Sequence, residues 1–225
     1  KLDLGDTDNS FVKGKKTAVM VLISPSDADT AADAWNYGMI ARDYGGSPNA
    51  WVDSVMTKVN TTFYGWSWGE VQFEWTIVGP FKTTGDAYTK ANCGAPTFTE
   101  DADTKFRLGP AAALSSGVNV SSYDFQVYWQ PYCSGSRFVG LARVGGVAAL
   151  LNGPWPFDTL TRPRADGSWW SEVLAHELGH NFGAHHASCI SNGKRGAVAW
   201  CDSDVTIKSG NDDSGGDDCS DVAAG

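Results

Sequence analysis

The sequence predicts an α/β fold, in which helices and strands form packed layers. Two observations predict it. Segment 17–23, TAVMVLI, is a short continuous apolar run, as expected of a central strand that is covered on both faces. After it, segments with helical periodicity alternate with segments whose apolar residues occur at every second position. Strands separated by helices favour a layered α/β structure.

The first predicted helix follows the central strand. Ser47 is suited to cap its amino end, and Pro48 is suited to its first turn. Apolar residues then recur at helical spacing and predict an amphipathic helix, namely Val52, Val55, Met56, Val59 and Phe63.

Two further strands are predicted by alternation. Segment 70–78 places Val71, Phe73, Trp75 and Ile77 on one face, and segment 123–129, YDFQVYW, alternates in the same way. Between them, segment 101–114 is weakly helical, and we expect a break at its Gly-Pro pair, residues 109–110.

The segments that follow are richer in glycine. Segment 140–152, GLARVGGVAALLN, is apolar and suits a strand that another backbone approaches closely. After residue 186 the composition shifts to Gly, Ser, Asn and Asp, so we expect an irregular tail. Its acidic cluster lacks the spacing of an EF-hand calcium loop, so we interpret it as a solvated loop.

Composition excludes some classes of function. The chain has 225 residues, a net charge of -9 and no apolar run of the length that spans a bilayer. Nucleic acid is excluded as a partner, because its phosphates require a basic surface. We expect no membrane span either.

An extracellular location is expected from cysteines and sequons. Five cysteines lack CxxC spacing and favour disulfides, with one left unpaired, and two Asn-x-Ser/Thr sequons begin at Asn60 and Asn119. The polar start has no signal peptide, so we expect that signal to have been removed or omitted. The prediction is a secreted, disulfide-bonded glycoprotein.

All four histidines lie in one eleven-residue segment, HELGHNFGAHH. Ser168 is suited to cap a helix over 169–182, and residues four apart share a helix face, so His176 and His180 would project together. Gly183 then suits a helix end in the left-handed conformation. The reversal would bring His186 to the same point, giving three nitrogen ligands and an open fourth position, which is the arrangement of a catalytic zinc site.

Glu177 follows the first predicted ligand and would lie beside the metal, within reach of a zinc-activated water. It is the candidate general base for peptide hydrolysis. A non-catalytic zinc site is the alternative, although such sites usually close with a fourth protein ligand. His185 has no role in this pattern, and we interpret it as a supporting or exposed residue.

The segment matches HExxHxxGxxH, the signature of the metzincin metalloproteases, at all five specified positions. Together with the VGG-containing segment and with VNTTFYGWSWGEV at 59–71, it resembles the gametolysin (autolysin) class of secreted peptidases. The resemblance covers residues 17–187 in order.

This resemblance implies a zinc-dependent endopeptidase that acts on extracellular or cell-wall proteins, the latter including hydroxyproline-rich glycoproteins. It implies a single catalytic domain, 1–225, with an N-terminal subdomain at 1–183 and a short C-terminal subdomain at 184–225. It also implies a metzincin-like fold, in which helices, including the active-site helix, pack on a twisted, mostly parallel sheet with an antiparallel edge strand. Segment 140–152 would be that edge strand and would hold an extended peptide by main-chain pairing. The alternative for that segment is an ordinary buried strand.

The chain departs from the metzincin pattern beneath the zinc. Metzincins carry a methionine turn after the third histidine, whereas Met20, Met39 and Met56 all precede it here. The stretch GDDCSDVAAG has Ala223 or Ala224 where the methionine is expected, so the turn is either altered or truncated. No tyrosine follows Tyr132, and zinc would stabilise the oxyanion largely alone.

A binding module is the competing function. Four aromatic residues near the predicted helix prompt a zinc-binding module that recognises glycans or cell walls without proteolysis, namely Trp155, Phe157, Trp169 and Trp170. Exposure of these rings would favour binding, and burial would favour a role in the core.

Overall fold

The computed structural model describes residues 13–94, 98–136, 138–154 and 168–184. In chain order the elements are β1 Gly14–Ser24, η2 Asp33–Trp35, α1 Gly38–Asp43, α2 Pro48–Trp66, β2 Val71–Lys82, α3 Phe98–Ser115, η3 Val120–Ser122, β3 Phe125–Gln130, β4 Gly140–Ala142, β5 Ala148–Asn152 and α4 Ser168–Asn181. Backbone contacts divide the chain into two units, Lys1–Phe182 and Gly183–Gly225. All of these elements belong to the first unit.

Five strands form one sheet in the order β2-β1-β3-β5-β4. The first three pairings are parallel, and only β4 runs antiparallel to its neighbour β5. The predicted fold class is therefore confirmed as a mixed α/β fold with a mostly parallel sheet and an antiparallel edge strand. None of the helices in the described ranges has the length and apolar character that crossing a membrane requires.

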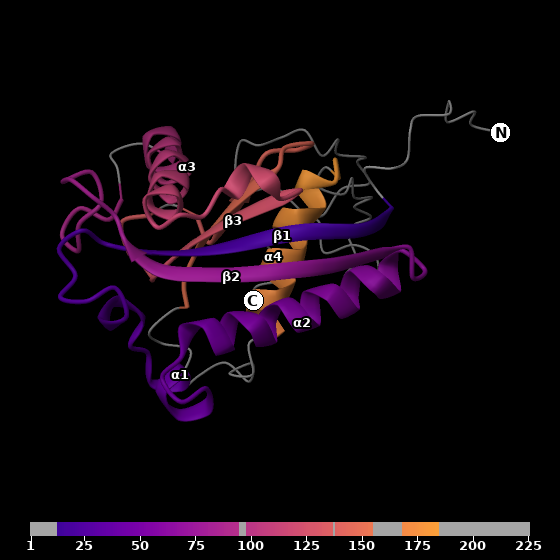
Figure 1. Ribbon diagram of the computed structural model, residues 1–225, viewed down its shortest axis with the longest axis horizontal. Helices are drawn as coiled ribbons and strands as arrows, with labels where there is room; N and C mark the ends of the chain where they lie inside the picture. The colour runs from indigo at the N-terminus through magenta and orange to yellow at the C-terminus, as the bar shows by residue number, and fades with distance from the viewer. Residues whose placement is uncertain (1–12, 95–97, 137, 155–167, 185–225) are drawn as a thin grey trace, which may run out of the picture. The chain divides into compact units, whose positions relative to one another are not determined.

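The central strand β1 is buried on both faces, as its continuous apolar run predicts. Met20 and Leu22 belong to the core beneath α2 and α4, while Val21 and Ile23 belong to the core beneath α3. Figure 1 shows α2 and α3 on opposite sides of the sheet. Because side chains alternate along a strand, one apolar run supplies both cores.

Helix α2 forms as its sequence predicts. The Ser47 hydroxyl accepts a hydrogen bond from Ala50 N at 3.2 Å, and Pro48 occupies the first turn. Its predicted apolar face is buried and joined by Trp51, which contacts the rings of Trp129 and Trp170 at centroid distances of 4.8 and 6.3 Å. The aromatic contacts connect α2, β3 and α4 in one core.

The predicted break in α3 is wrong, because the helix continues through Gly109 and Pro110. A Cβ atom at residue 109 would lie 2.2 Å from Cδ1 of Tyr128 on β3. The glycine therefore allows α3 to approach the sheet closely, and it does not mark a helix end. Packing against the sheet offsets the lost hydrogen bond at the proline.

Segment 140–152 is not one strand, which corrects the sequence prediction. It is a hairpin, in which β4 is the antiparallel edge strand and β5 is the inner strand, paired with β3. The intervening turn contains Gly145, whose φ of 69° lies in the left-handed region that glycine adopts without strain. The predicted edge position thus holds for β4 and the alternative of a buried strand holds for β5, while pairing with a substrate peptide stays a prediction.

The loops at the end of the sheet carry a disulfide between Cys93 and Cys133. Asn152 at the end of β5 accepts from Cys133 N at 2.8 Å and donates to Cys133 O at 3.1 Å. The segment that leads into β4 is thereby held to the sheet. The remaining cysteines, Cys189, Cys201 and Cys219, lie outside the described residues, so a second disulfide and one unpaired cysteine, as expected from five cysteines, stay predictions.

Candidate active site

The predicted site helix, α4, has one face in the core. Leu174 and Leu178 are 0% exposed and pack in the cluster formed with α2 and the sheet. Successive helix residues are about 100° apart, so His176 lies roughly 200° around the helix from Leu174. The helix begins at Ser168 itself, one residue earlier than predicted. Its buried leucines therefore fix which side faces away from the core.

His176 and His180 come together on that side. Their Nε2 atoms are 3.0 Å apart, and the ring planes are nearly perpendicular, at 88°. When two nitrogens bind the same tetrahedral zinc ion, each at about 2.0 to 2.1 Å, the nitrogens are about 3.3 Å apart. The donor pair thus fits a shared metal ion with a small adjustment.

Glu177 points away from solvent and toward the edge strand. It is 6% exposed, and burial raises the pKa of its carboxyl group to about 8. A Cβ atom placed on Gly140 of β4 would lie 2.5 Å from Oε1 of Glu177 and 2.8 Å from its Cγ. The backbone of β4 therefore lies directly against this carboxyl group.

The carboxyl end of α4 is tied to the hairpin of β4 and β5. Gly145 N donates to His180 O at 2.8 Å. The buried Asn181 side chain donates from Nδ2 to Arg143 O and to Ala148 O, each at 3.2 Å. Neither Asn181 nor the role of Gly140 was predicted from the sequence. An asparagine in the core-facing row of an apolar helix was the available signal for the first.

The third predicted ligand, His186, lies outside the described residues, as does His185. Gly183 has a φ of 92°, in the left-handed region expected for a helix-ending glycine. Within the described ranges no three His, Cys, Asp or Glu side chains form a group that could hold a metal ion. The structure thus describes two of the three predicted ligands.

The sequence model of metallo-peptidase family M12 matches residues 31–215. This range includes α4 and the whole histidine segment. The chain belongs to metallo-peptidase family M12. Family M12 peptidases are zinc-dependent hydrolases of peptide bonds, so the family accounts for the converging histidines and implies a protein substrate. A search of curated proteins finds no match to the chain.

The methionines of this M12 peptidase are core residues. Met20, Met39 and Met56 are at most 2% exposed and belong to the cluster beneath α2 and α4. The stretch in which a methionine turn is expected, with Ala223 and Ala224, lies outside the described residues.

Of the four aromatic residues that prompted a glycan-binding function, the structure describes two. Trp170 is 1% exposed and contacts Trp129 at a centroid distance of 5.7 Å, so it is a core residue. Trp169 is half-buried against the same core. Trp155 and Phe157 lie outside the described residues. Burial of Trp170 weakens the case for a binding surface at α4.

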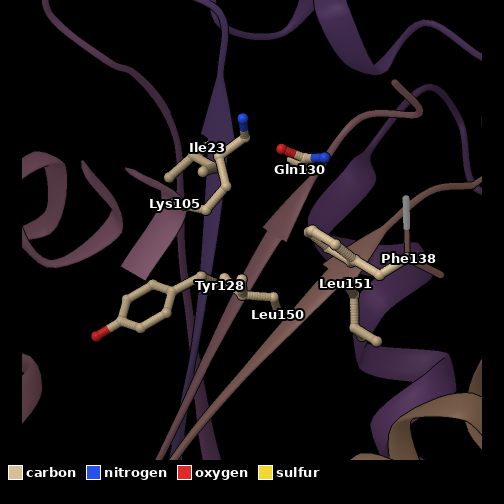
Figure 2. A pocket seen from close by; sticks show the side chains of 7 residues that line it. All are labelled: Ile23, Lys105, Tyr128, Gln130, Phe138, Leu150 and Leu151. Atoms are coloured by element: carbon tan, nitrogen blue, oxygen red, sulfur yellow. The ribbon is translucent and has the colours of Figure 1, made fainter. Parts of the chain in front are cut away.

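A packing gap lies between α3 and the sheet (Figure 2). It comprises about 130 Å³ of non-atom space, which includes open solvent, and it has no room for a water molecule. Figure 2 shows the Lys105 ammonium and the Gln130 amide at one end of it, with the Tyr128 hydroxyl pointing away. Lys105 donates to Asp101 Oδ1 at 3.0 Å and to Cys93 O at 2.6 Å. This gap contains no predicted site residue and has no space for a substrate.

Proposed function

We propose that the chain is a zinc-dependent endopeptidase, with His176, His180 and His186 as metal ligands and Glu177 as general base. The observation that carries the proposal is the pair of Nε2 atoms 3.0 Å apart, beside a carboxyl group that is almost fully buried. A structural zinc site would give no reason to bury a carboxylate next to its ligands.

The donors fit zinc by their chemistry as well as by their spacing. Imidazole nitrogen is a common zinc ligand, and two histidines four residues apart on a helix present both nitrogens to one point. Zinc, when bound, lowers the pKa of a water molecule to about 7 and polarises the scissile carbonyl group. His186 would complete the ligand set.

Glu177 supplies the proton transfers. Its carboxylate takes a proton from the attacking water as the new C–O bond forms, and delivers that proton to the leaving nitrogen as the C–N bond breaks. No hydrogen bond or ion pair to another described residue occupies this carboxyl group, so both oxygens are available for the transfers. The close approach of Gly140 on β4 limits where this carboxyl group can lie.

The edge strand supports an endopeptidase. β4 is the last strand of the sheet, and its outer side pairs with no other strand among the described residues. An extended substrate segment can add to such an edge by main-chain hydrogen bonds, which fits cleavage within a chain. Resemblance to gametolysin-like peptidases makes cell-wall glycoproteins the proposed substrates.

We propose secretion on the basis of the disulfide and the sequons. The Cys93–Cys133 bond is typical of proteins from oxidising compartments. The two sequons differ in geometry. Asn119 is exposed at the start of η3. Asn60 lies on α2, and its side chain accepts a hydrogen bond from Phe73 N of β2 at 2.7 Å. Mass spectrometry after expression in a eukaryotic secretory host should find glycan at Asn119, and glycan at Asn60 alone would contradict this reasoning.

The decisive variant is Glu177→Gln, which keeps the size of the side chain and removes the base. Zinc content should stay at that of wild type, while cleavage of a generic protein substrate should fall by about 10²- to 10⁴-fold. Glu74→Gln is the matched control, because Glu74 is exposed on β2 and pairs with Lys15 at the surface. It should leave both measurements unchanged.

Three results would be informative. Equal cleavage by wild type and Glu177→Gln would refute the role of the glutamate. Zinc binding without any cleavage by wild type would favour the glycan-binding module and direct attention to Ala223. Loss of zinc in Glu177→Gln would show that the glutamate acts on the metal site itself.

A further inference from the structure

Gly140 makes the closest approach of the sheet to the candidate base. A Cβ atom at this position would lie within 3.0 Å of three atoms of Glu177, namely Oε1, Cγ and Cδ. Real Cβ atoms essentially never lie that close to other heavy atoms, so any side chain at residue 140 must displace something. The conflict involves the middle of the glutamate side chain as well as its tip.

The backbone of Gly140 does not itself require glycine. Its φ lies outside the left-handed region, unlike that of Gly145 in the next turn, where φ is 69°. Alanine could therefore adopt the same backbone conformation without strain. The contact with Glu177 is the feature of the described structure that excludes a side chain here.

Neither the helix nor the strand can easily retreat from this contact. Three hydrogen bonds clamp the end of α4 to the hairpin, one from Gly145 N to His180 O and two from the Asn181 side chain. On the far side, Leu174 and Leu178 are fully buried in the core. A methyl group at residue 140 would therefore move the Glu177 side chain before it moved either element.

We propose that Gly140 is a positioning residue, whose missing side chain makes the space that Glu177 occupies beside the histidines. This inference rests on the proposed role of Glu177 as general base. Gly140 of β4 limits the carboxyl group on the side of the edge strand. Steric contact with Gly140 therefore positions the Glu177 carboxyl group, without a hydrogen bond to another described side chain.

The consequence is a specific kinetic defect in Gly140→Ala. Displacement of a catalytic group by about 1 Å can cost on the order of 10²-fold in rate. We expect kcat to fall by about 10²-fold with KM within about two-fold of wild type, because the defect lies in proton transfer. Loss of substrate binding at the edge strand would instead raise KM.

Gly65→Ala is the matched control. Gly65 lies in α2 at a φ outside the left-handed region, and no atom lies within 4 Å of its Cβ position. The same added methyl group should leave kcat, KM and zinc content unchanged there. A similar defect in both variants would overturn the proposal.

A readout without activity comes from crystal structures of wild type and Gly140→Ala. The Glu177 carboxyl group should move by about 1 Å or more, with the β4 backbone in place, because an undisplaced contact is sterically excluded. An unmoved carboxyl group would overturn the proposal. This test stands even if wild type cleaves no substrate, which would refute the proposed function alone.

Truncating the glutamate tests the contact directly. In a Glu177→Ala background Cγ, Cδ and Oε1 are all absent, so Gly140→Ala should lower the melting temperature there by no more than about half of the drop that it causes in wild type. An undiminished drop in this background would refute the steric explanation. If Gly140→Ala alone fails to fold, the double variant must fold; failure of both would show a general packing role and refute positioning.

Discussion

The clamp between α4 and the hairpin predicts a large loss of stability in Asn181→Ala. Asn181 is 0% exposed and donates to Arg143 O and Ala148 O. Each of the two lost hydrogen bonds is worth about 1 kcal/mol. Arg143 O keeps a second bond, from Gly146 N at 2.9 Å, so a carbonyl left unpaired would add a further 1 to 3 kcal/mol or so at Ala148 O alone. Because Asn181 Oδ1 is itself buried with no partner among the described residues, its removal offsets part of this cost. We expect a net loss of about 2 to 4 kcal/mol.

Urea unfolding followed by circular dichroism at neutral pH measures this loss, with an unchanged m-value as evidence that the variants unfold in the same way. Asn181→Asp should lose at least as much, because it keeps the shape but turns an acceptor toward two carbonyl oxygens. Asn36→Ala is the exposed control and should change stability by no more than about 0.5 kcal/mol. A loss below about 1 kcal/mol in Asn181→Ala, or an aspartate variant more stable than the alanine variant, would refute the reasoning.

Three further outcomes are expected in thermal or urea unfolding. Gly109→Ala should lose more than about 2 kcal/mol despite the better helix propensity of alanine, because its methyl group meets the Tyr128 ring; a gain in stability would contradict the close approach. Cys93→Ser should lose up to about 4 kcal/mol, since its bond to Cys133 spans a separation of 40 residues; equal stability of wild type with and without reductant would count against this. Asp124→Ala should lose about 1 kcal/mol near neutral pH, because the Asp124 carboxylate accepts from the backbone N–H and hydroxyl of a β1 threonine. The backbone bond lowers the pKa of Asp124 in the folded state, so its contribution is complete above about pH 4 and disappears as pH falls through that lowered pKa; a difference that persists unchanged at lower pH would contradict it.

Local periodicity predicted the elements whose environment is uniform along their length. The apolar run 17–23 predicted a strand buried on both faces, and Ser47 with Pro48 predicted the start of α2. The spacing of His176 and His180 predicted their shared helix face, because that geometry depends on the helix alone. In each case the determining interactions lie within a few residues of one another.

The features that sequence could not predict depend on contacts between distant segments. A glycine followed by proline usually interrupts a helix, and only the contact with the Tyr128 ring shows that Gly109 allows close packing of α3 on the sheet and does not mark a helix end. The pairing of Cys93 with Cys133 follows from which loops the sheet brings together. The burial of Glu177 depends on Gly140 of β4, and no local sequence pattern predicts that this strand lies against α4.

The order of strands in the sheet has a consequence for biosynthesis. Both neighbours of β1 are parallel to it, so neither is connected to it by a hairpin. β3 pairs with β1 across a separation of 107 residues in the sequence. At about 5 to 20 residues per second, the ribosome needs roughly 5 to 20 s to supply that partner. Until then one edge of the apolar segment 17–23 lacks its partner strand, and an unpaired apolar strand edge favours aggregation. Natural strands are often protected by a charged residue, but Ala18–Ile23 are at most 1% exposed in the finished sheet, so a charge there would prevent folding.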